Sequence, residues 1–284
     1  MTIAYQGEPG AFSEAAARRV DPDAPLEPCR SFEDVFDAVQ AGTVAYGVLP
    51  IENSIGGSIH RNYDLLLERT LPIVGEVELP VIHHLLALPG ATLDGLRRVY
   101  SHPQGLAQCE RFLRTLTKVE IIATYDTAGS AKMVADAGVT DAGAIASARA
   151  GEVFGLTSLA ASVQDFDDNI TRFLVVGATP LPHRVADKTS IVFSLPNEPG
   201  SLFKALSVFA LRGISLTKLE SRPIPGRPWE YLFYVDLAAA RAEVHCTRAL
   251  AHLGEFAPML RTLGTYASWK THEGMQPDPF EVVS

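Results

Sequence analysis

The sequence predicts an α/β protein in which two doubly wound α/β subdomains precede a smaller domain of βαββαβ order. Two observations lead to this class. Short β-rich runs alternate with helical patterns over the first 180 residues, in two successive sets, as in parallel sheets with helices on both faces. After a proline-containing linker around 180–188 the order changes, and an antiparallel hairpin separates two helices. A length of 284 residues accommodates more than one domain.

Composition excludes several classes of protein. Apolar residues make up 47% of the chain and charged residues 20%, so a sizeable core can be buried and disorder is excluded. The 24 Lys+Arg against 33 Asp+Glu give a net charge of −9, which argues against nucleic acids or anionic membranes as partners, because both require a basic surface. No stretch approaches the ~20 apolar residues of a membrane span.

The cysteines and the first residues indicate the compartment. Cys29, Cys109 and Cys246 have a spacing that fits neither a zinc cluster nor a disulfide framework, and an odd number suits a reducing environment. The chain starts without the basic and apolar segments of a signal peptide. We therefore expect a soluble cytoplasmic protein.

Local patterns predict each element of the first set. Ser31, followed by Asp34 three residues later, forms a capping-box pattern at the start of a helix that Gly42 ends. Ser13 is expected to cap the helix before it. In chain order we expect a strand over 2–5, helices over 13–19 and 31–41, a strand over 44–49, a helix over 58–69 and a strand-rich stretch over 71–88 split near Pro80.

The second set repeats this alternation. Pro103 suits the first turn of a helix that reaches about Leu116, and Asp126 or Thr127 caps a helix that ends at Ala137. The remaining elements are strands over 97–100, 119–124 and 143–146 and a helix over 147–154. Sheets of this kind bind ligands at the carboxyl ends of their strands, where the loops gather.

The third part has a different order. We expect a strand over 189–195, a helix over 200–211, strands over 215–222 and 231–237, a helix over about 241–256 and a strand over 263–269. This is the ferredoxin-like split βαββαβ arrangement. Residues 271–284 are expected to form a tail.

Four polar loops stand out as candidate binding segments. They are Pro50–Gly57, Ser101–Gln104 with Gln108 one helical turn later, Asp126–Ser130, and Asn169–Phe173. Free backbone N–H groups at a strand-to-helix turn suit a carboxylate, and an arginine next to a threonine can clamp one. Taken singly, each loop is equally consistent with an ordinary polar turn, helix cap or exposed strand start.

Other chemistries lack their motifs. The glycines at 7 and 10 do not have the Gly-x-Gly-x-x-Gly order of a dinucleotide turn, and no P-loop or Gly-x-Ser-x-Gly elbow occurs. His83 and His84 cannot both face one metal from an extended strand, because neighbouring side chains point to opposite sides; core or surface histidines are favoured. We expect no metal and no cofactor, so the chemistry must depend on hydrogen bonds, charge and orientation.

Taken together, these segments resemble the prephenate dehydratase family. The resemblance is carried by Tyr5–Glu14, Pro50–Ser54, Ser101–Gln104 with Ala107-Gln108-Cys109, and Thr171-Arg172-Phe173, in that order. Downstream, Asn197–Leu202 and Leu219–Pro223 are similar to the phenylalanine-binding motifs of that family's ACT regulatory domain, with Phe203 where valine is usual. The resemblance covers nearly the whole chain and is that of the stand-alone form.

The resemblance implies a fold and a reaction. The fold has two α/β subdomains around a cleft, like periplasmic binding proteins: a catalytic domain over 1–180 (subdomain 1 over 1–79 and 165–180, subdomain 2 over 80–164) and an ACT domain over 188–270. The reaction converts prephenate to phenylpyruvate, carbon dioxide and water in phenylalanine biosynthesis. L-Phenylalanine is the implied effector, and paired ACT domains imply a homodimer or homotetramer.

The resemblance also implies the residues of the site. Thr171 is the leading catalytic residue, and the other catalytic candidates are Glu52, Asn53, Ser101, Gln108 and Arg172. The expected substrate-binding residues are Ser54, His102, Thr127 and Phe173. The expected phenylalanine-binding residues are Asn197, Pro199, Gly200, Ser201, Leu202, Leu219, Glu220, Ser221, Arg222 and Pro223. We expect Thr171 to donate a hydrogen bond to the departing hydroxyl, with Glu52 as a proton source and helix amides or Arg172 as carboxylate anchors.

Three alternatives remain. A non-catalytic binding protein also has two lobes around a hinge, although the absence of a signal peptide and the presence of Thr171-Arg172-Phe173 count against it. Arogenate dehydratase performs the same chemistry on the transaminated substrate, and Ala128 resembles the form that accepts prephenate. A dehydrogenase is disfavoured by the missing glycine motif.

Overall fold

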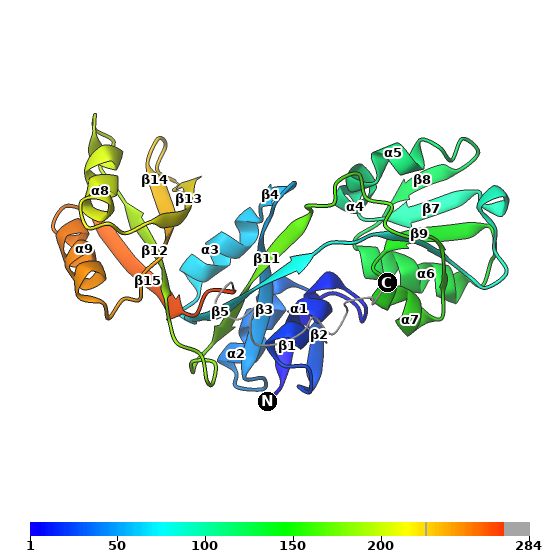
Figure 1. Cartoon of the computed structure of the whole chain (residues 1–284), viewed down its shortest axis with the longest axis horizontal. Coiled ribbons are helices and arrows are strands. Elements are labelled where there is room, and N and C mark those ends of the chain that lie inside the picture. Colours follow the sequence, from blue (N-terminus) through cyan, green and yellow to red (C-terminus); the bar gives the residue numbers. More distant parts are fainter. Residues whose placement is uncertain (225, 270–284) are drawn as a thin grey trace. The chain divides into compact units, whose positions relative to one another are not determined.

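The computed structural model describes residues 1–224 and 226–269, so the tail expected over 271–284 lies outside the described residues. The chain divides into two compact units, Met1–Arg69 with Val77–Leu174, and Thr70–Glu76 with the chain from Val175 onward. The first unit contains two α/β lobes, and the second contains the βαββαβ domain (Figure 1). The predicted fold class is confirmed. Among the described residues, no helix is long and apolar enough to cross a membrane.

The first lobe is built on a sheet in the order β5-β11-β3-β1-β2. Its strands are β1 (Ile3–Gln6), β2 (Leu26–Cys29), β3 (Tyr46–Asn53), β5 (Ile73–Pro80) and β11 (Ile170–Gly177), with a short β4 (Gly57–Ser58) paired to the end of β3. Strand β1 pairs in parallel with both β2 and β3. The helices are α1 (Phe12–Val20), α2 (Phe32–Gln40) and α3 (His60–Glu68). The predicted capping box at Ser31 is confirmed, with both of its hydrogen bonds at 3.1 Å.

The second lobe has a five-stranded sheet in the order β10-β6-β9-β7-β8. Figure 1 shows α4 and α5 on one face and α6 and α7 on the other. Each face has its own apolar cluster, one around Ala131 of α6 and the other around Leu113 of α5. The elements are β6 (His84–Ala87), a 3-10 turn (Leu93–Gly95), β7 (Arg98–Ser101), α4 (Pro103–Gln108), α5 (Glu110–Leu113), β8 (Glu120–Ala123), α6 (Thr127–Ala137), β9 (Ala142–Ala146), α7 (Ala148–Phe154) and β10 (Thr157–Ala160).

Several local predictions differ from the structure, three of them near the loops singled out above. Helix α1 begins at Phe12, with Ala11 at the N-cap, so Ser13 lies inside the first turn instead of capping it. Strand β3 continues to Asn53, where a loop was expected. The helix expected from Pro103 to Leu116 is interrupted at Cys109, because the carbonyl of Gln108 accepts a hydrogen bond from the amide of Asp165 (2.7 Å) and the backbone of Cys109 leaves the helical region.

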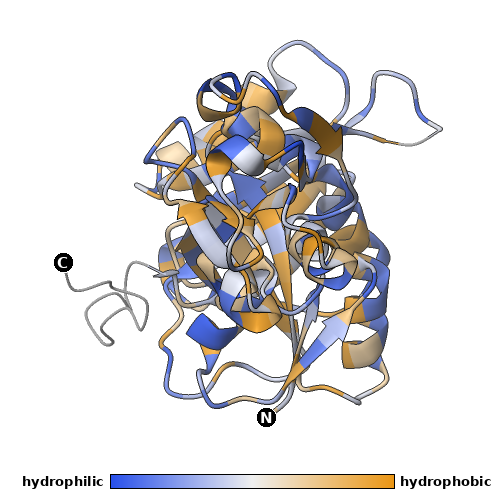
Figure 2. Cartoon of the chain, turned by 90° about the vertical axis from the view of Figure 1, so that its right-hand side faces the viewer, coloured by the Kyte–Doolittle hydropathy of each residue, from blue (hydrophilic) through white to orange (hydrophobic). Residues whose placement is uncertain are grey.

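The second unit has the predicted βαββαβ order. Its elements are β12 (Lys188–Ser194), α8 (Ser201–Ala210), β13 (Leu216–Pro223), β14 (Tyr231–Leu237), α9 (Val244–Gly254) and β15 (Met259–Tyr266). The strands follow the order β13-β14-β12-β15, with antiparallel pairing throughout, and β13 is at the edge. Both helices bury one face over the sheet in a single apolar cluster. Figure 2 shows hydrophobic and hydrophilic residues mixed along the chain's helices, as expected for elements that bury one face.

Candidate active site

A cavity of about 420 Å³ lies in the first unit and is lined by residues of both lobes. The lining comes from the carboxyl ends of β1 and β3, the segments that follow β7 and β8, and the first residues of α1 and β11. This is where parallel sheets expose backbone amides and loop side chains. The four polar loops singled out in the sequence all contribute to this cavity.

The cavity brings six of the ten expected catalytic and substrate-binding residues together. These six are Asn53, His102, Gln108, Thr127, Thr171 and Phe173. Asn53, Gln108 and Thr171 are polar yet at most 8% exposed, so their hydrogen-bonding groups face each other or the cavity instead of solvent. The other four, Glu52, Ser54, Ser101 and Arg172, are not among the described residues that line the cavity.

Strand geometry explains why Glu52 and Arg172 are outside the lining. Both lie on regular strands, next to Asn53 on β3 and next to Thr171 on β11. Successive side chains of a strand point to opposite faces. Because Asn53 and Thr171 face the cavity, their neighbours face away from it. Arg172 could reach the substrate beside Thr171 only if the strand began after these two residues, and β11 begins at Ile170.

The two serines outside the lining hold the walls of the site in place. The hydroxyl of Ser54 donates to the carbonyl of Asp168 (2.8 Å) and accepts from the amide of Ile170 (2.9 Å), which ties the end of β3 to the start of β11. The hydroxyl of Ser101 is fully buried and donates to the carbonyl of Ile145 at 2.7 Å. A Cβ on Gly105 would lie 2.8 Å from Ser101 Oγ, so glycine is required at this position for α4 to pack against the end of β7.

The hydrogen bonds of Asn53 determine the orientation of its amide. Oδ1 accepts from the backbone amides of Ile55 (3.1 Å) and Gly56 (2.7 Å), and a backbone amide can only donate. The Nδ2 group must therefore face the other way, where it donates to Thr171 Oγ1 (2.9 Å) and to Asn169 Oδ1 (2.7 Å). Since Thr171 Oγ1 accepts this bond, the hydroxyl hydrogen of Thr171 is left to donate to another group.

The same reasoning extends to Gln108 and His83. Gln108 Nε2 donates to Asn53 Oδ1 at 3.4 Å, so Gln108 Oε1 faces His83 Nε2 at 2.9 Å, and His83 carries its proton on Nε2. The three hydrogen bonds run in the same direction from donor to acceptor: His83 donates to Gln108, Gln108 to Asn53, and Asn53 to Thr171. Hydrogen bonds aligned in this manner polarise one another, so this relay strengthens Thr171 as a donor.

His83 is the residue that the sequence analysis missed. It is 2% exposed, lines the cavity and packs edge-on against Phe12 with ring centroids 5.4 Å apart. Burial lowers the pKa of His83 below its ordinary value, against the opposing effect of the Gln108 hydrogen bond, so the ring is neutral. The available signal was a histidine inside an otherwise apolar run. Among the described residues, no group of His, Cys, Asp and Glu side chains could hold a metal ion.

The expected phenylalanine-binding residues lie on two elements of the second unit. Asn197 and Pro199 lie in the connection after β12, and Gly200 is the N-cap of α8, with a φ of 81° that favours glycine. Ser201 and Leu202 begin α8, and Leu219, Glu220, Ser221, Arg222 and Pro223 lie on the edge strand β13. Phe203 is 75% exposed, so this side chain does not fill the core of the domain.

Comparison with known proteins agrees with this architecture. The family model described as prephenate dehydratase matches residues 3–180, and the ACT domain model matches residues 189–244. A protein of Arabidopsis thaliana named arogenate dehydratase/prephenate dehydratase 2, chloroplastic, is 51% identical over 280 residues, which cover 94% of this chain and 72% of that protein.

Two solved structures are similar to this chain over more than nine tenths of their length. The prephenate dehydratase of Arthrobacter aurescens in complex with L-Phe has a TM-score of 0.87 and 32% identity, covering 98% of this chain and 92% of that one. GqqA, described as a novel type of quorum quenching acylase, has a TM-score of 0.86 and 36% identity, covering 94% of this chain and 98% of that one. Because the prephenate dehydratase model matches more than half of its residues and the ACT domain model matches a later segment, the chain belongs to the prephenate dehydratase family.

Proposed function

We propose that the cavity converts prephenate to phenylpyruvate, carbon dioxide and water. The ring carboxylate leaves as carbon dioxide, its bonding electrons enter the ring, and the ring hydroxyl departs as hydroxide, which takes up a proton to become water. The ring becomes aromatic, so the chain's task is to assist the hydroxyl and orient the substrate. The observation that supports this reaction most directly is the free hydrogen of Thr171, whose oxygen is occupied by Asn53.

Thr171 acts as a hydrogen-bond donor in this mechanism. A threonine hydroxyl is a very poor acid at neutral pH, so it stabilises the developing hydroxide without giving up its own proton. In the relay, His83 donates to Gln108, Gln108 donates to Asn53, and Asn53 donates to the Thr171 hydroxyl. Solvent at the cavity protonates the released hydroxide, which makes a carboxylic acid such as Glu52 unnecessary as a proton source.

The test is an ultraviolet assay of phenylpyruvate formation from prephenate with two variants at one position. Thr171→Val keeps the shape of the side chain but removes the hydroxyl, and we expect turnover to fall by ~10²–10⁴-fold. Thr171→Ser keeps the hydroxyl and should stay within about tenfold of the parent. Parent-level turnover in Thr171→Val would remove this residue from the mechanism.

Arogenate is the second candidate substrate, because a relative with 51% identity carries both activities in its name. Arogenate has an ammonium group where prephenate has a ketone. Ala128, which resembles the prephenate-accepting form, is fully buried in an apolar cluster under the first turn of α6. Its influence on the choice is therefore exerted through the position of Thr127, which lines the cavity. Parallel assays with arogenate, read out as phenylalanine formation, separate the two substrates.

An acylase activity like that named for GqqA is not supported by the cavity. Acyl transfer requires a nucleophile beside a base. Ser13 is the serine among the described residues that line the cavity, and its hydroxyl has no hydrogen-bonded base within the described part of the chain. We therefore assign the cavity to dehydration.

We also propose that L-phenylalanine regulates the reaction through the second unit. The backbone amides at the start of α8 would receive its carboxylate, because Gly200 leaves that end without a side-chain cap. Strand β13 would form the opposite wall between two ACT domains, since it is a sheet edge on which Leu219 is 44% exposed. This arrangement requires a homodimer or homotetramer, which light scattering of the purified chain would measure.

Regulation requires coupling between phenylalanine and substrate. Thermodynamic linkage demands that the two ligands change each other's affinity by the same factor. Titration of phenylalanine in the presence and absence of phenylpyruvate measures that factor. Equal affinities under both conditions would exclude coupling.

A cytoplasmic location stays a prediction, and fractionation of the source cells would test it.

A further inference from the structure

The proposed substrate carries two carboxylates, yet the cavity offers no obvious cation. Among the described residues that line it there is no lysine and no arginine, and the charged group present is the carboxyl of Asp126. A carboxylate in such a site must be held by neutral donors. Five helices have their N-cap or first residue at the cavity, α1, α2, α3, α4 and α6, and the backbone amides of a helix N-terminus are suitable donors.

Three of these five N-termini are already occupied by side chains. At the start of α2 the hydroxyl of Ser31 accepts from the amide of Asp34 at 3.1 Å. The Nδ1 of His102 accepts from the amide of Gln104 (3.2 Å) at the start of α4, which has only six residues. The carboxylate of Asp126 accepts from the amide of Gly129 (2.6 Å) at the start of α6. A second carboxylate next to Asp126 would be repelled, and burial already raises the pKa of that group. The segments after Ser101 and Thr127, expected as anchors from the sequence, are therefore poor anion sites.

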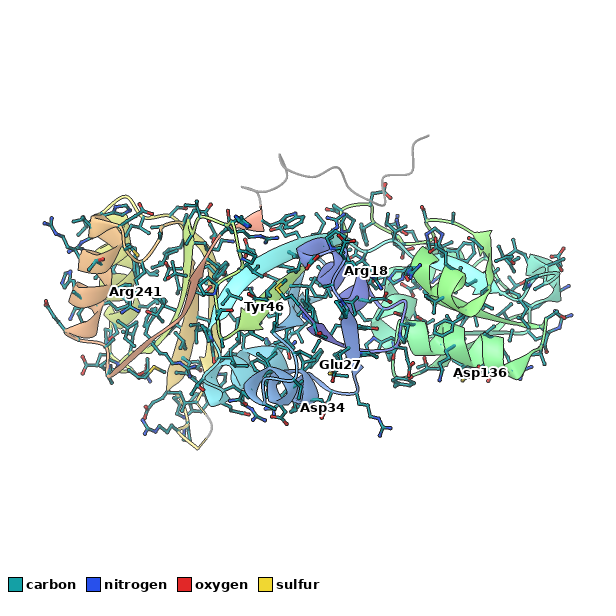
Figure 3. The ribbon with its side chains drawn as sticks, turned by 90° about the horizontal axis from the view of Figure 1, so that it is seen from below. Arg18, Glu27, Asp34, Tyr46, Asp136 and Arg241 are labelled. Carbon is teal, nitrogen blue, oxygen red and sulfur yellow. The ribbon has the colours of Figure 1, made fainter. Side chains whose placement is uncertain are left out.

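The N-termini of α1 and α3 both lack a side-chain cap, but α3 contributes only its N-cap Ile59 to the described lining, whereas α1 contributes its N-cap and its first two residues. Its N-cap is Ala11, which has no side chain able to cap the helix. Glu14 in the first turn does not fill this role, because its carboxylate accepts from the amide of Gly10 and pairs with Arg18 Nε at 3.0 Å. Figure 3 labels Arg18 on this helix. Ala11, Phe12 and Ser13 all line the cavity, so the open end of the helix faces the ligand space.

Ser13 provides the second, independent observation. Its side chain is 8% exposed and lines the cavity, and its hydroxyl has no hydrogen-bond partner within residues 1–224 and 226–269. Buried hydroxyl groups in folded proteins are almost always hydrogen-bonded. A ligand oxygen in the cavity would complete the missing bond at the same place where the helix amides are available.

On the basis of the proposed function, we propose that the N-terminus of α1 and the hydroxyl of Ser13 bind the pyruvyl carboxylate of the substrate. Of the two carboxylates, the pyruvyl group is retained in the product, whereas the ring carboxylate leaves. Strong hydrogen bonds to the leaving group would stabilise the ground state and slow the reaction. The anchor must therefore hold the group that does not react, and the product must bind there as the substrate does.

Titration of phenylpyruvate tests this site, because the product keeps only the pyruvyl carboxylate. Ser13→Ala removes one hydrogen bond to a charged group and should weaken phenylpyruvate binding about 10-fold. Ser13→Asp places a carboxylate over the same amides and should weaken it by about 100-fold or more, whereas the uncharged Ser13→Asn matches it in shape and should resemble Ser13→Ala. For prephenate, Ser13→Ala should raise KM with kcat nearly unchanged.

The outcomes separate this site from the proposed reaction. Parent-like phenylpyruvate affinity in Ser13→Ala and Ser13→Asp, both shown to be folded by circular dichroism, would overturn the site. Loss of prephenate binding alone, with phenylpyruvate unaffected, would also overturn it, because the ring carboxylate would then be the anchored group. Should the parent fail to process prephenate, the reaction proposal fails, while the loss of phenylpyruvate affinity in the variants would still support the carboxylate site.

Discussion

Asn53 Nδ2 donates to Thr171 Oγ1 across 2.9 Å, although 118 residues separate them in the chain. This bond determines what each partner can do. Asn53 is oriented by two backbone amides, and Thr171 accepts from it, so the threonine hydrogen is directed to a third group. A side chain of limited acidity thereby becomes an oriented donor.

Reversing this bond should inactivate the site. In Asn53→Asp a carboxylate replaces the amide, so the side chain accepts from Thr171 instead of donating to it, and its charge repels a dianionic substrate. We expect kcat for prephenate to fall by ~10²-fold or more. Glu52→Gln, the reverse exchange of carboxylate and amide at the neighbouring residue, which faces away from the cavity, is the matched control. Turnover in Asn53→Asp above that of the control would contradict the relay.

The buried ring of His83 predicts a pH dependence of stability. Because burial lowers its pKa below the ordinary 6.5, the unfolded chain binds a proton at this position more readily than the folded chain does. The free energy of unfolding contributed by this ring therefore decreases as the pH falls below about 6.5. Urea denaturation at pH 7, 6 and 5 should show the parent losing more stability than His83→Gln, in which His84 is still present. Parallel curves for the two proteins would refute this.

The ion pair between Lys188 Nζ and Glu76 Oε1 should stabilise the folded state of the second unit. The atoms lie 2.6 Å apart, and the Glu76 side chain is 1% exposed and also accepts from the amide of Trp269. Glu76→Gln would leave a buried ammonium without its counter-charge, which costs about 3–5 kcal/mol. The exposed pair of Arg114 and Glu110 supplies the control, because Glu110→Gln should change the free energy of unfolding by about 0.5 kcal/mol. Equal effects of both substitutions in urea denaturation would argue against this role.

Cys29 should react slowly with alkylating reagents despite its partial exposure. Burial, together with the carboxylates of Glu27 and Asp34, raises the pKa of its thiol to about 11. The thiolate is the nucleophile, so iodoacetamide at pH 8 should modify Cys29 about 10²-fold more slowly than free cysteine. Mass spectrometry of timed samples measures this rate. Glu27→Gln should increase it, and a parent rate equal to that of free cysteine would disprove the effect.

Most of the fold could be predicted because helix and strand periodicities are local. The capping box at Ser31 and the start of α8 next to Gly200 are properties of a few adjacent residues. Strands β2 (Leu26–Cys29) and β10 (Thr157–Ala160) were missed because neither is rich in β-branched or aromatic residues, and β2 also contains Pro28. These strands depend on pairing with β1 and β6, which no local pattern reveals.

The site could be predicted only in part, for a related reason. Motif resemblance located Asn53, Gln108 and Thr171, but it also selected Glu52 and Arg172, which alternate with them along strands. Whether β3 ended before Glu52 or continued to Asn53 depended on its pairing with β4. His83 was set aside together with His84, because neighbouring side chains of a strand cannot face one metal and a core or surface role was favoured. Its partner Gln108 follows 25 positions later.

The course of β5 and β11 limits how the chain can be dissected. Each of these strands starts in one compact unit and finishes in the other. Near the start of β5, Ile73 pairs in register with Gly264 of β15, and Glu76 forms the ion pair with Lys188. A fragment cut after residue 180 would retain Glu76 but lose its ammonium. The end of the first family match is consequently not a clean boundary. Truncation there should expose the edge of β5 that Gly264 covers and lower the free energy of unfolding of the remaining part.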